Sequence, residues 1–395
     1  MEVTIEHELQ RFIEVWVTVF ASLTYCYFIS RSNIIPKGFI RLLSLLPIIT
    51  IFTLLPFSLS SMIFSSPTGF LVGWLANFNL LLLAFDKGPL SSSSLSSNNI
   101  SLPLFILLAC LPIKIKQNPS PKIITKSSQN STDDQNQILS SSSSSSSKSN
   151  KPHKSHLYYG IQGSVLALVL CVYEYKHYLH PNLILLLYCI LVFSAVELFL
   201  AMFAVLPRLL VGLEMEPQFN YPLLSTSLQD FWGRRWNLTV SGLLRSTVYE
   251  PVRNICTHNL GRWWARTIGI LSTFVVSGLM HELVFFYMGR LWPTWDVTWT
   301  FVLQGVCLIL EIELKEALKS RFRLHRLVSG PLTIGFVVVT GMWLYFPVYG
   351  RVGVIVKMNE EIGILGEFVK GVAKKSWISV PGWNQSIYHV HTNSY

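Results

Sequence analysis

The sequence predicts an all-α polytopic membrane protein with about eight to nine transmembrane or re-entrant helices. Hydrophobic residues make up 51% of the 395 residues and charged residues only 13%, a composition too apolar for a soluble protein of this length. The apolar residues form runs long enough to cross a bilayer, and Lys and Arg lie mostly between these runs. The net charge of +10 therefore reflects cytosolic loops and does not indicate a nucleic-acid partner.

The N-terminal third contains three expected spans and one ambiguous segment. The first run follows an acidic start and precedes a basic stretch, which indicates a retained span that begins in the lumen. The spans are Leu9–Ile29, Ile40–Phe64 and Gly69–Phe85. Ile100–Ile115 is short and carries two prolines, so it is either a full span or a re-entrant segment. We favour the re-entrant form, because a full span would place the following lysines in the lumen.

A change in composition divides the chain. Residues 117–156 are rich in Ser, Asn and Lys and have almost no residue able to build a core, so we expect a disordered cytosolic loop. This loop separates N-terminal membrane helices, residues 1–116, from a larger membrane core, residues 157–350. Within that core a cytosolic loop is expected over 207–266, and a C-terminal tail follows over 351–395.

The core should contain five further spans. These are Leu157–Tyr173, Asn182–Val205, Thr267–Met288, Thr300–Leu314 and Pro331–Tyr349. Glu197 lies inside the second of them and is a secondary polar-site candidate, since ionisable groups in membrane spans usually serve function. Beyond Asn237, apolar residues recur at helical spacing, which predicts an amphipathic helix in the cytosolic interface. The tail stretch Val352–Val369 is weakly amphipathic and is left unassigned.

The span Thr267–Met288 is unusual because it carries His281 and Glu282. A membrane-buried ionisable residue is costly and usually functional. At helical spacing His281 shares a face with five other residues: Phe274, Ser277, Gly278, Phe285 and Met288. Ser277 and Gly278 leave a notch there, where either a substrate chain or a neighbouring helix can approach. The structural alternative is a buried histidine bonded to a backbone carbonyl or to Glu282.

The preceding loop concentrates cations and indoles. The residues concerned are Asp230, Trp232, Arg234, Arg235, Trp236 and Asn237. Arginines suit the phosphates of an anionic co-substrate, and indole faces suit stacking, whereas contact with anionic lipids and the ordinary basic bias of cytosolic loops are the alternatives. Ser227 to Asp230 matches a helix capping box, and Asn237 is also placed to cap a helix.

Two strings carry a specific resemblance. NYPLLSTSLQDFWGRRWNLTVSGLLRSTVYEPV from Asn220 to Val252, followed at membrane-span distance by SGLMHELVFFY from Ser277 to Tyr287, resembles the plant wax synthase family. These are long-chain-alcohol O-fatty-acyltransferases, related to membrane-bound O-acyltransferases. The resemblance implies a multi-pass enzyme of the endoplasmic reticulum membrane that transfers a fatty acyl group from acyl-CoA to a long-chain fatty alcohol, with acyl-CoA as co-substrate and no cofactor or metal.

The resemblance also implies roles for residues. His281 would be the catalytic histidine, and Asn237 the second polar catalytic position. The acyl-CoA side would comprise Asp230, Trp232, Arg234, Arg235 and Trp236. A neutral histidine suits a general base, because its unperturbed pKa of about 6.5 lies near working pH, and the Asn237 amide would donate to the oxyanion. The hydrophobic groove for acyl chain and alcohol would run past Phe274, Ser277, Gly278 and Phe285.

Three alternatives remain open at this point. In the first, the enzyme belongs to the same family but its acceptor is a sterol instead of a fatty alcohol. In the second, the acyl group passes through a covalent intermediate on Cys256 or Ser277. In a different class, the chain is a transporter with His281 and Glu197 as a proton relay, although the sequence shows no internal repeat.

Overall fold

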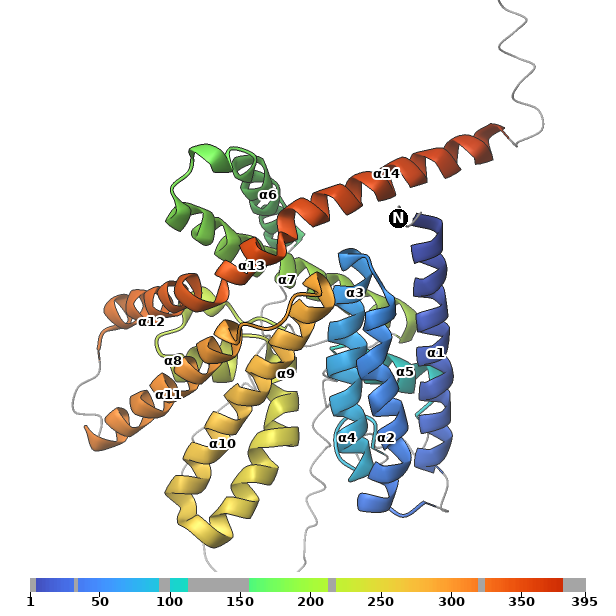
Figure 1. Cartoon of the computed structure of the whole chain (residues 1–395). Coiled ribbons are helices and arrows are strands. Elements are labelled where there is room, and N and C mark those ends of the chain that lie inside the picture. Colours follow the sequence, from blue (N-terminus) through green and yellow to red (C-terminus); the bar gives the residue numbers. More distant parts are fainter. Residues whose placement is uncertain are drawn as a thin grey trace, which may run out of the picture.

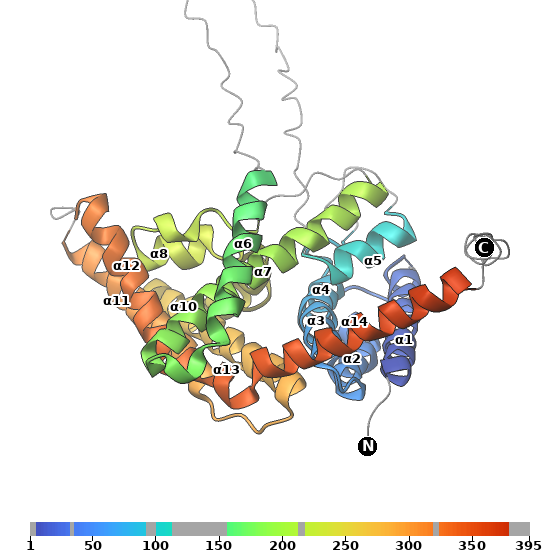
Figure 2. The same cartoon turned by 90° about the horizontal axis from the view of Figure 1, so that it is seen from above.

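The computed structural model describes residues 5–31, 35–91, 100–112, 156–211, 218–318 and 324–378. Within these ranges every regular element is a helix, which confirms the all-α class (Figures 1 and 2). The predicted disordered loop over 117–156 lies outside the described ranges, except for His156 at the start of a helix, and so does the tail beyond residue 378.

Seven helical stretches in the described part of the chain are long and apolar enough to cross a bilayer. They are Ile5–Arg31, Phe39–Ser58, Met62–Ala84, Pro181–Phe203, Leu238–Gly289, Asp296–Ala317 and Arg326–Gly371. Leu157–Tyr173 is apolar but shorter. The protein is therefore a multi-pass membrane protein, while the predicted count of eight to nine is not confirmed.

The first group of helices forms an upright bundle (Figure 1). Its elements are α1 (Ile5–Arg31), α2 (Phe39–Leu54) with a 3₁₀ turn Leu55–Ser58, α3 (Met62–Thr68), a π-helical segment Gly69–Ala76, and α4 (Asn77–Ala84). The last three form one continuous rod. The predicted span Ile40–Phe64 ran too far, because the chain reverses at residues 59–61 and Met62 already begins the next helix. Both flanks of this turn are apolar, so composition alone did not reveal it.

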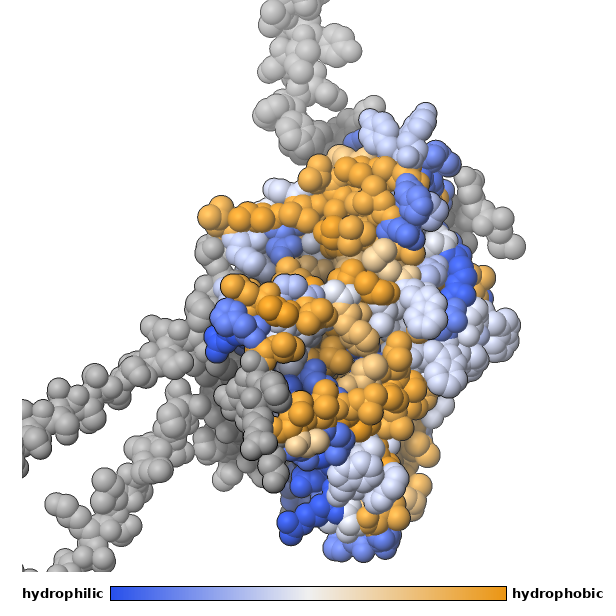
Figure 3. Space-filling model, turned by 90° about the vertical axis from the view of Figure 1, so that its left-hand side faces the viewer, coloured by the Kyte–Doolittle hydropathy of each residue, from blue (hydrophilic) through white to orange (hydrophobic). Residues whose placement is uncertain are grey.

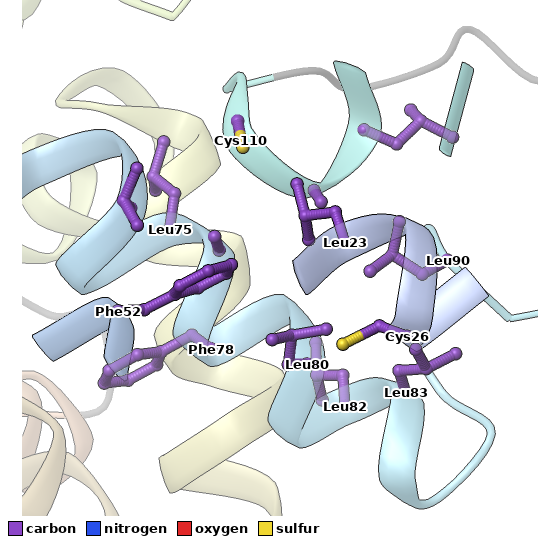
Figure 4. Packing of buried hydrophobic residues seen from close by; sticks show 14 of the residues in the cluster. Leu23, Cys26, Phe52, Leu75, Phe78, Leu80, Leu82, Leu83, Leu90 and Cys110 are labelled. Atoms are coloured by element: carbon purple, nitrogen blue, oxygen red, sulfur yellow. The ribbon is translucent and has the colours of Figure 1, made fainter. Parts of the chain in front are cut away.

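Apolar side chains from α1, α2 and the α3–α4 rod fill the core of this bundle. Figure 4 shows Leu23 and Cys26 of α1 directed toward Phe52 of α2 and Leu80 of α4, all essentially buried. The cluster continues to Cys110 at the end of α5 (Leu102–Cys110). With nine residues at about 1.5 Å each, α5 is only about 13.5 Å long and cannot cross a core of about 30 Å. This length supports the re-entrant interpretation of that segment.

The second group contains the remaining helices. They are α6 (His156–Tyr173), α7 (Pro181–Val211), α8 (Leu228–Asp230), α9 (Leu238–Leu244), α10 (Glu250–Gly289), α11 (Asp296–Ala317), α12 (Arg326–Thr340), α13 (Pro347–Val352) and α14 (Val354–Ile378). Short 3₁₀ turns occupy Lys176–Tyr178 and Pro222–Leu224, and π-helical segments occupy Phe231–Arg235, Arg245–Tyr249 and Gly341–Tyr345. Most predicted spans lie inside these helices, with the true ends several residues beyond the apolar runs.

The region predicted as the loop 207–266 is largely helical. α9, the π segment after it and the start of α10 form one arm of a hairpin, which turns at Gly261 with φ 79° and ψ 169° (Figure 1). The predicted interfacial helix beyond Asn237 is wrong in its placement. Val240, Leu243 and Leu244 are buried in the core shared with the first bundle, because this arm packs beside α4.

The unassigned stretch Val352–Val369 belongs mainly to α14, which lies across the ends of α1 and α3 (Figures 1 and 2). Glu361 of α14 accepts hydrogen bonds from the Met62 and Ile63 amides, both at 2.8 Å. Glu8 of α1 accepts hydrogen bonds from the Ser60 and Ser61 amides, at 2.6 and 2.7 Å. Carboxylates from both ends of the chain therefore cap the N-terminus of α3, where the helix dipole favours negative charge.

The outer surface is strongly apolar. Figure 3 shows broad hydrophobic bands on the face where α11 and α12 lie. Exposed large side chains on these two helices include Leu310, Leu314, Leu332 and Val339. Contiguous apolar surface of this kind would aggregate in water, so it is the surface that contacts lipid.

Candidate active site

α10 positions His281 between two anchored ends. At one end Arg266 forms ion pairs with Glu313, at 2.6 Å, and with Glu316, both on α11. At the other end Arg290 donates to three backbone carbonyls of the turn after α2, at 2.6 to 3.1 Å. His281 follows Arg266 by 15 residues, about 22 Å along a helix, so it lies deep in the bundle.

The His281 ring is fixed in one tautomer. Its Nδ1 lies 2.7 Å from the backbone carbonyl of Ser277, one turn earlier. A carbonyl only accepts, so Nδ1 carries the hydrogen and Nε2 of the neutral ring keeps its lone pair. Among the described residues no group pairs with Nε2, and this atom is not fully enclosed. The carbonyl bond matches the structural alternative raised from the sequence, yet it also leaves the ring as a competent proton acceptor.

Three aromatic residues from three different elements surround this ring. Phe301 of α11 stacks on it with centroids 4.4 Å apart and planes at 29°. Trp74 meets it edge-on at 5.0 Å and 78°. Tyr345 lies 6.0 Å away at 75°. Trp74 and Tyr345 both belong to π-helical segments, which frequently occur at functional sites.

The notch beside His281 is filled by a helix. A Cβ at Gly278 would lie 2.8 Å from the Thr298 Cα of α11, so the two backbones are in direct contact. Phe274 packs equally closely on Gly305 of α11. Of the two occupants that the sequence allowed for the notch, the structure has the neighbouring helix. The four predicted groove residues are buried, and a substrate must approach His281 from another side.

Glu282 has a structural contact that the sequence did not reveal. Its side chain is buried and its Oε1 accepts the Thr298 amide at 3.2 Å. This bond caps the first turn of α11, the helix that carries Phe301. Glu282 therefore aligns α10 with α11 and is not the hydrogen-bond partner of His281.

The loop before α9 is held together by its own polar residues. The Ser227 hydroxyl accepts the Asp230 amide at 3.1 Å, as the capping-box pattern predicted. Asp230 forms an ion pair with Arg235 at 2.6 Å, and Arg235 also donates to the carbonyls of Asn220 and Tyr221. Asp230 and Arg235 thus fold the loop, whereas Arg234 has no ionic partner among the described residues.

The two tryptophans of this loop are packed inside the protein. Trp232 donates from Nε1 to Gln304 at 3.2 Å, and Gln304 donates to the Thr340 hydroxyl at 2.7 Å. Trp232 also contacts Phe301, the residue stacked on His281. Trp236 stacks on Phe231 with centroids 5.4 Å apart and planes at 18°. Trp232 thus connects the loop to α11 and, through Gln304, to α12, whereas Trp236 packs on Phe231 within the loop and on Phe193 of α7. Neither indole is an exposed stacking platform.

Asn237 caps α9. It adopts φ 34° and ψ 70°, and its Oδ1 accepts the Val240 amide at 3.2 Å. This is the capping role that the sequence left open beside the catalytic one. The cap occupies only the oxygen, so the Nδ2 group keeps both hydrogens for another acceptor.

A cleft of about 1070 Å³ opens beside this loop. Its cations are Arg234, Arg235, Lys315 at the end of α11 and Arg326 at the start of α12. Lys315 is paired with Glu311 at 2.7 Å, and the Glu311 carboxylate also accepts the Leu228 amide at 2.7 Å. Arg234 and Arg326 have no ion pair within the described ranges, which leaves two unneutralised cations, from two different elements, in the lining of the cleft.

The cleft and His281 lie at two levels of the same bundle. Phe301, at the histidine, and Lys315, at the cleft, are 14 residues apart on α11, or about 21 Å. Trp232 and Gln304 lie between these levels. The sequence did not indicate Trp74, Phe301 or Tyr345, because aromatic residues in apolar runs are usually core. Lys315 and Arg326 lie between two predicted spans, and nothing in the sequence singled them out.

Comparisons with known proteins agree with this architecture. The model of the membrane bound O-acyl transferase family matches residues 215–303, which include both the loop and His281. The chain is 41% identical over 364 residues to acyl-CoA–sterol O-acyltransferase 1 of Arabidopsis thaliana, covering 92% of this chain and 97% of the relative. It is 40% identical over 384 residues to the long-chain-alcohol O-fatty-acyltransferase of Simmondsia chinensis, covering 96% and 99%.

The chain belongs to the plant wax synthase family. A further relative, probable long-chain-alcohol O-fatty-acyltransferase 9 of Arabidopsis thaliana, is 42% identical over 371 residues, covering 92% of this chain and 98% of the relative. The protein is therefore an acyl-CoA-dependent O-acyltransferase of lipid biosynthesis, as the two sequence strings implied.

Proposed function

We propose that the protein transfers a fatty acyl group from acyl-CoA to a long-chain fatty alcohol and releases a wax ester, with His281 as general base. The observation that carries this proposal is the His281 ring, whose Nδ1 is bonded to the Ser277 carbonyl while Nε2 has no partner in the part of the chain that the structure describes. A neutral imidazole in this tautomer accepts a hydroxyl proton without any change of its other contacts. Two similar proteins named as long-chain-alcohol O-fatty-acyltransferases support the alcohol as acceptor.

The proposed reaction balances with these groups alone. The hydroxyl oxygen attacks the thioester carbonyl carbon while its proton moves to Nε2. The new C–O bond remains, the C–S bond breaks, and Nε2 returns the proton to the CoA thiolate. The products are the ester and free CoA. The Asn237 Nδ2 group remains the expected donor to the oxyanion, since its cap uses only the oxygen.

The basic cleft is the proposed site for the CoA phosphates. Two cations without ion pairs in the described ranges, Arg234 and Arg326, are opposite in charge to the CoA phosphates. The volume of about 1070 Å³ exceeds that of most small-ligand pockets, which suits a large co-substrate. The separation of about 21 Å along α11 then requires a long flexible arm to bring the thioester to His281. The pantetheine arm of CoA has this character. The proposal places the cleft on the cytosolic face of the endoplasmic reticulum membrane.

Microsomes from cells that express the chain provide the test of the acceptor. Labelled palmitoyl-CoA is supplied with a long-chain alcohol, a phytosterol or diacylglycerol, and the labelled products are separated. We expect wax ester as the main product. The sterol is the second candidate, because one relative of 41% identity is named as a sterol O-acyltransferase. Sterol ester as the main product would show that the acceptor is a sterol and not a fatty alcohol. Absence of any alcohol-dependent ester would refute the proposed function.

Replacement of Arg234 and Arg326 together by Gln should raise the KM for acyl-CoA by about tenfold or more. Each cation contributes charge-assisted contacts to phosphates that are present in both the ground state and the transition state, so KM changes more than kcat. Arg235 is left in place because it holds Asp230. Initial rates at varied palmitoyl-CoA measure this effect.

The matched control is Lys370→Gln, an exposed cation on α14 whose ion pair with Glu367 is also exposed. This substitution should leave both the KM for acyl-CoA and kcat unchanged. A fall in kcat with an unchanged KM for acyl-CoA in the double variant would place these arginines outside the CoA site.

A further inference from the structure

Trp74 carries an unexplained polar group beside His281. The side chain is 2% exposed, and its Nε1 is buried without a hydrogen-bond partner among the described residues. Buried indole N–H groups normally find an acceptor, and leaving one unpaired is unfavourable. The ring meets His281 edge-on at 5.0 Å. The indole that carries this unpaired N–H is therefore a direct neighbour of the residue proposed as the base.

The position of Trp74 is fixed relative to α10. Gly69 and Gly73, on the same π-helical segment, both pack against the Tyr287 ring. The Ser65 hydroxyl of α3 donates to the Tyr287 carbonyl at 3.2 Å, and the Tyr287 hydroxyl donates to Thr53 at 2.7 Å. The segment that carries Trp74 is thus attached to the helix that carries His281. The two rings are held together by surrounding contacts and not by a bond between them.

The two free nitrogens form a complementary pair. Trp74 Nε1 only donates, and His281 Nε2, with Nδ1 bonded to Ser277, only accepts. One chemical group satisfies both at once, namely a hydroxyl, whose oxygen accepts and whose hydrogen is donated. A thioester carbonyl only accepts and would satisfy the indole alone. An alkyl chain would satisfy neither.

We propose that Trp74 Nε1 and His281 Nε2 together bind the acceptor hydroxyl, so that Trp74 is a substrate-binding residue for the alcohol. This inference rests on the proposed function and adds the contact that orients the nucleophile. Trp74 donates to the hydroxyl oxygen, which turns the O–H bond toward Nε2. Because Nε1 is enclosed, a small movement of the Trp74 side chain must admit the hydroxyl, while the helical segment that carries it stays in place. During transfer the proton moves to His281, the oxygen forms the ester bond, and Trp74 neither gains nor loses a proton.

Trp74→Phe tests the contact, because it keeps the aromatic packing and removes the N–H. At saturating acyl-CoA we expect the KM for hexadecanol to rise about tenfold, as for loss of one hydrogen bond, with less than about a twofold change in kcat and in the KM for acyl-CoA. Trp16→Phe is the matched control. Trp16 of α1 also has a buried Nε1 without a partner in the described part of the chain, but its ring contacts are Phe12 and Phe20 of the same helix, whereas the ring contacts of His281 are Trp74, Phe301 and Tyr345. It should leave the KM for hexadecanol unchanged.

A second measurement needs no variant. Hexadecyl methyl ether has an oxygen that accepts from Trp74 but no hydrogen for His281, and heptadecane, an alkane of comparable chain length, has neither. As inhibitors competitive with hexadecanol, the ether should bind the wild-type protein about tenfold more tightly than the alkane. Trp74→Phe should abolish this difference, whereas Trp16→Phe should retain it.

Each outcome decides one question. An unchanged KM for hexadecanol in Trp74→Phe, or equal inhibition of the wild type by ether and alkane, overturns the inference. A fall in kcat without a rise in that KM also overturns it, since the N–H would then serve the transition state instead of the bound alcohol. If Trp74→Phe does not accumulate, the inhibitor pair on wild type decides. Failure of the wild type to form ester from any alcohol refutes the proposed function itself, which separates the two failures.

Discussion

His281→Ala should reduce ester formation by at least about 100-fold, because general base catalysis contributes about 10²- to 10⁴-fold. His281→Gln should be nearly as inactive, since the amide fills much of the same space but does not relay a proton. The rate of wax ester formation in microsomes, normalised to the amount of the protein in the membrane, measures both. The ring packs between side chains and carries no ion pair, so the protein should still accumulate.

His258→Ala is the control for the histidine experiment. His258 is exposed on the first arm of the α9–α10 hairpin, and its loss should leave the rate unchanged. Activity of His281→Gln within a few-fold of wild type would show that His281 serves as a hydrogen-bonding residue only. In that case the bond to the Ser277 carbonyl would be its whole role.

Gly278→Ala should cause the second largest loss. The added Cβ would lie 2.8 Å from the Thr298 Cα, a backbone atom that yields only if α11 moves. Overpacking of this kind costs about 1 to 3 kcal/mol. It should also shift Phe301 away from the His281 ring, so we expect a lower thermal midpoint in detergent together with a fall in the ester-forming rate.

Gly335→Ala is the matched comparison for Gly278→Ala. It is also a helical glycine, but a Cβ there meets nothing within 4 Å. Its stability should be unchanged or higher by roughly 0.5 to 1 kcal/mol, the usual gain for alanine over glycine inside a helix. Equal thermal midpoints and equal ester-forming rates for the two variants would mean that α10 and α11 are not in close contact at Gly278.

The sequence was sufficient for the helical class and for most spans, because an apolar run of about 20 residues has one stable arrangement in a bilayer. It was not sufficient for the turn at residues 59–61, where apolar residues continue through the reversal. Nor did it predict that Val240, Leu243 and Leu244 of the first arm of the α9–α10 hairpin are buried against the first bundle, since the same periodicity suits an interfacial helix and a packed one.

The site shows the same limit at the level of single residues. Arg234 and Arg235 are equivalent in the sequence, yet one is free in the cleft and the other holds Asp230. Asn237 fitted both a capping and a catalytic pattern in the sequence, and only the folded structure shows that its Oδ1 accepts the Val240 amide and caps α9. Trp74 lies about 200 residues from His281 in an apolar run. Contacts over such a separation depend on tertiary packing and leave no local signal.

The double carboxylate cap on α3 has a consequence for the order of assembly during synthesis. The Met62 amide and its partner Glu361 are 299 residues apart, which at roughly 5 to 20 residues per second means a delay of about 15 to 60 s between their emergence from the ribosome. During this time the first bundle is in the membrane while only Glu8 is available to cap the turn. The N-terminal helices therefore gain their last capping contact from a residue made long after them, so a chain stopped before α14 lacks a contact in the first bundle.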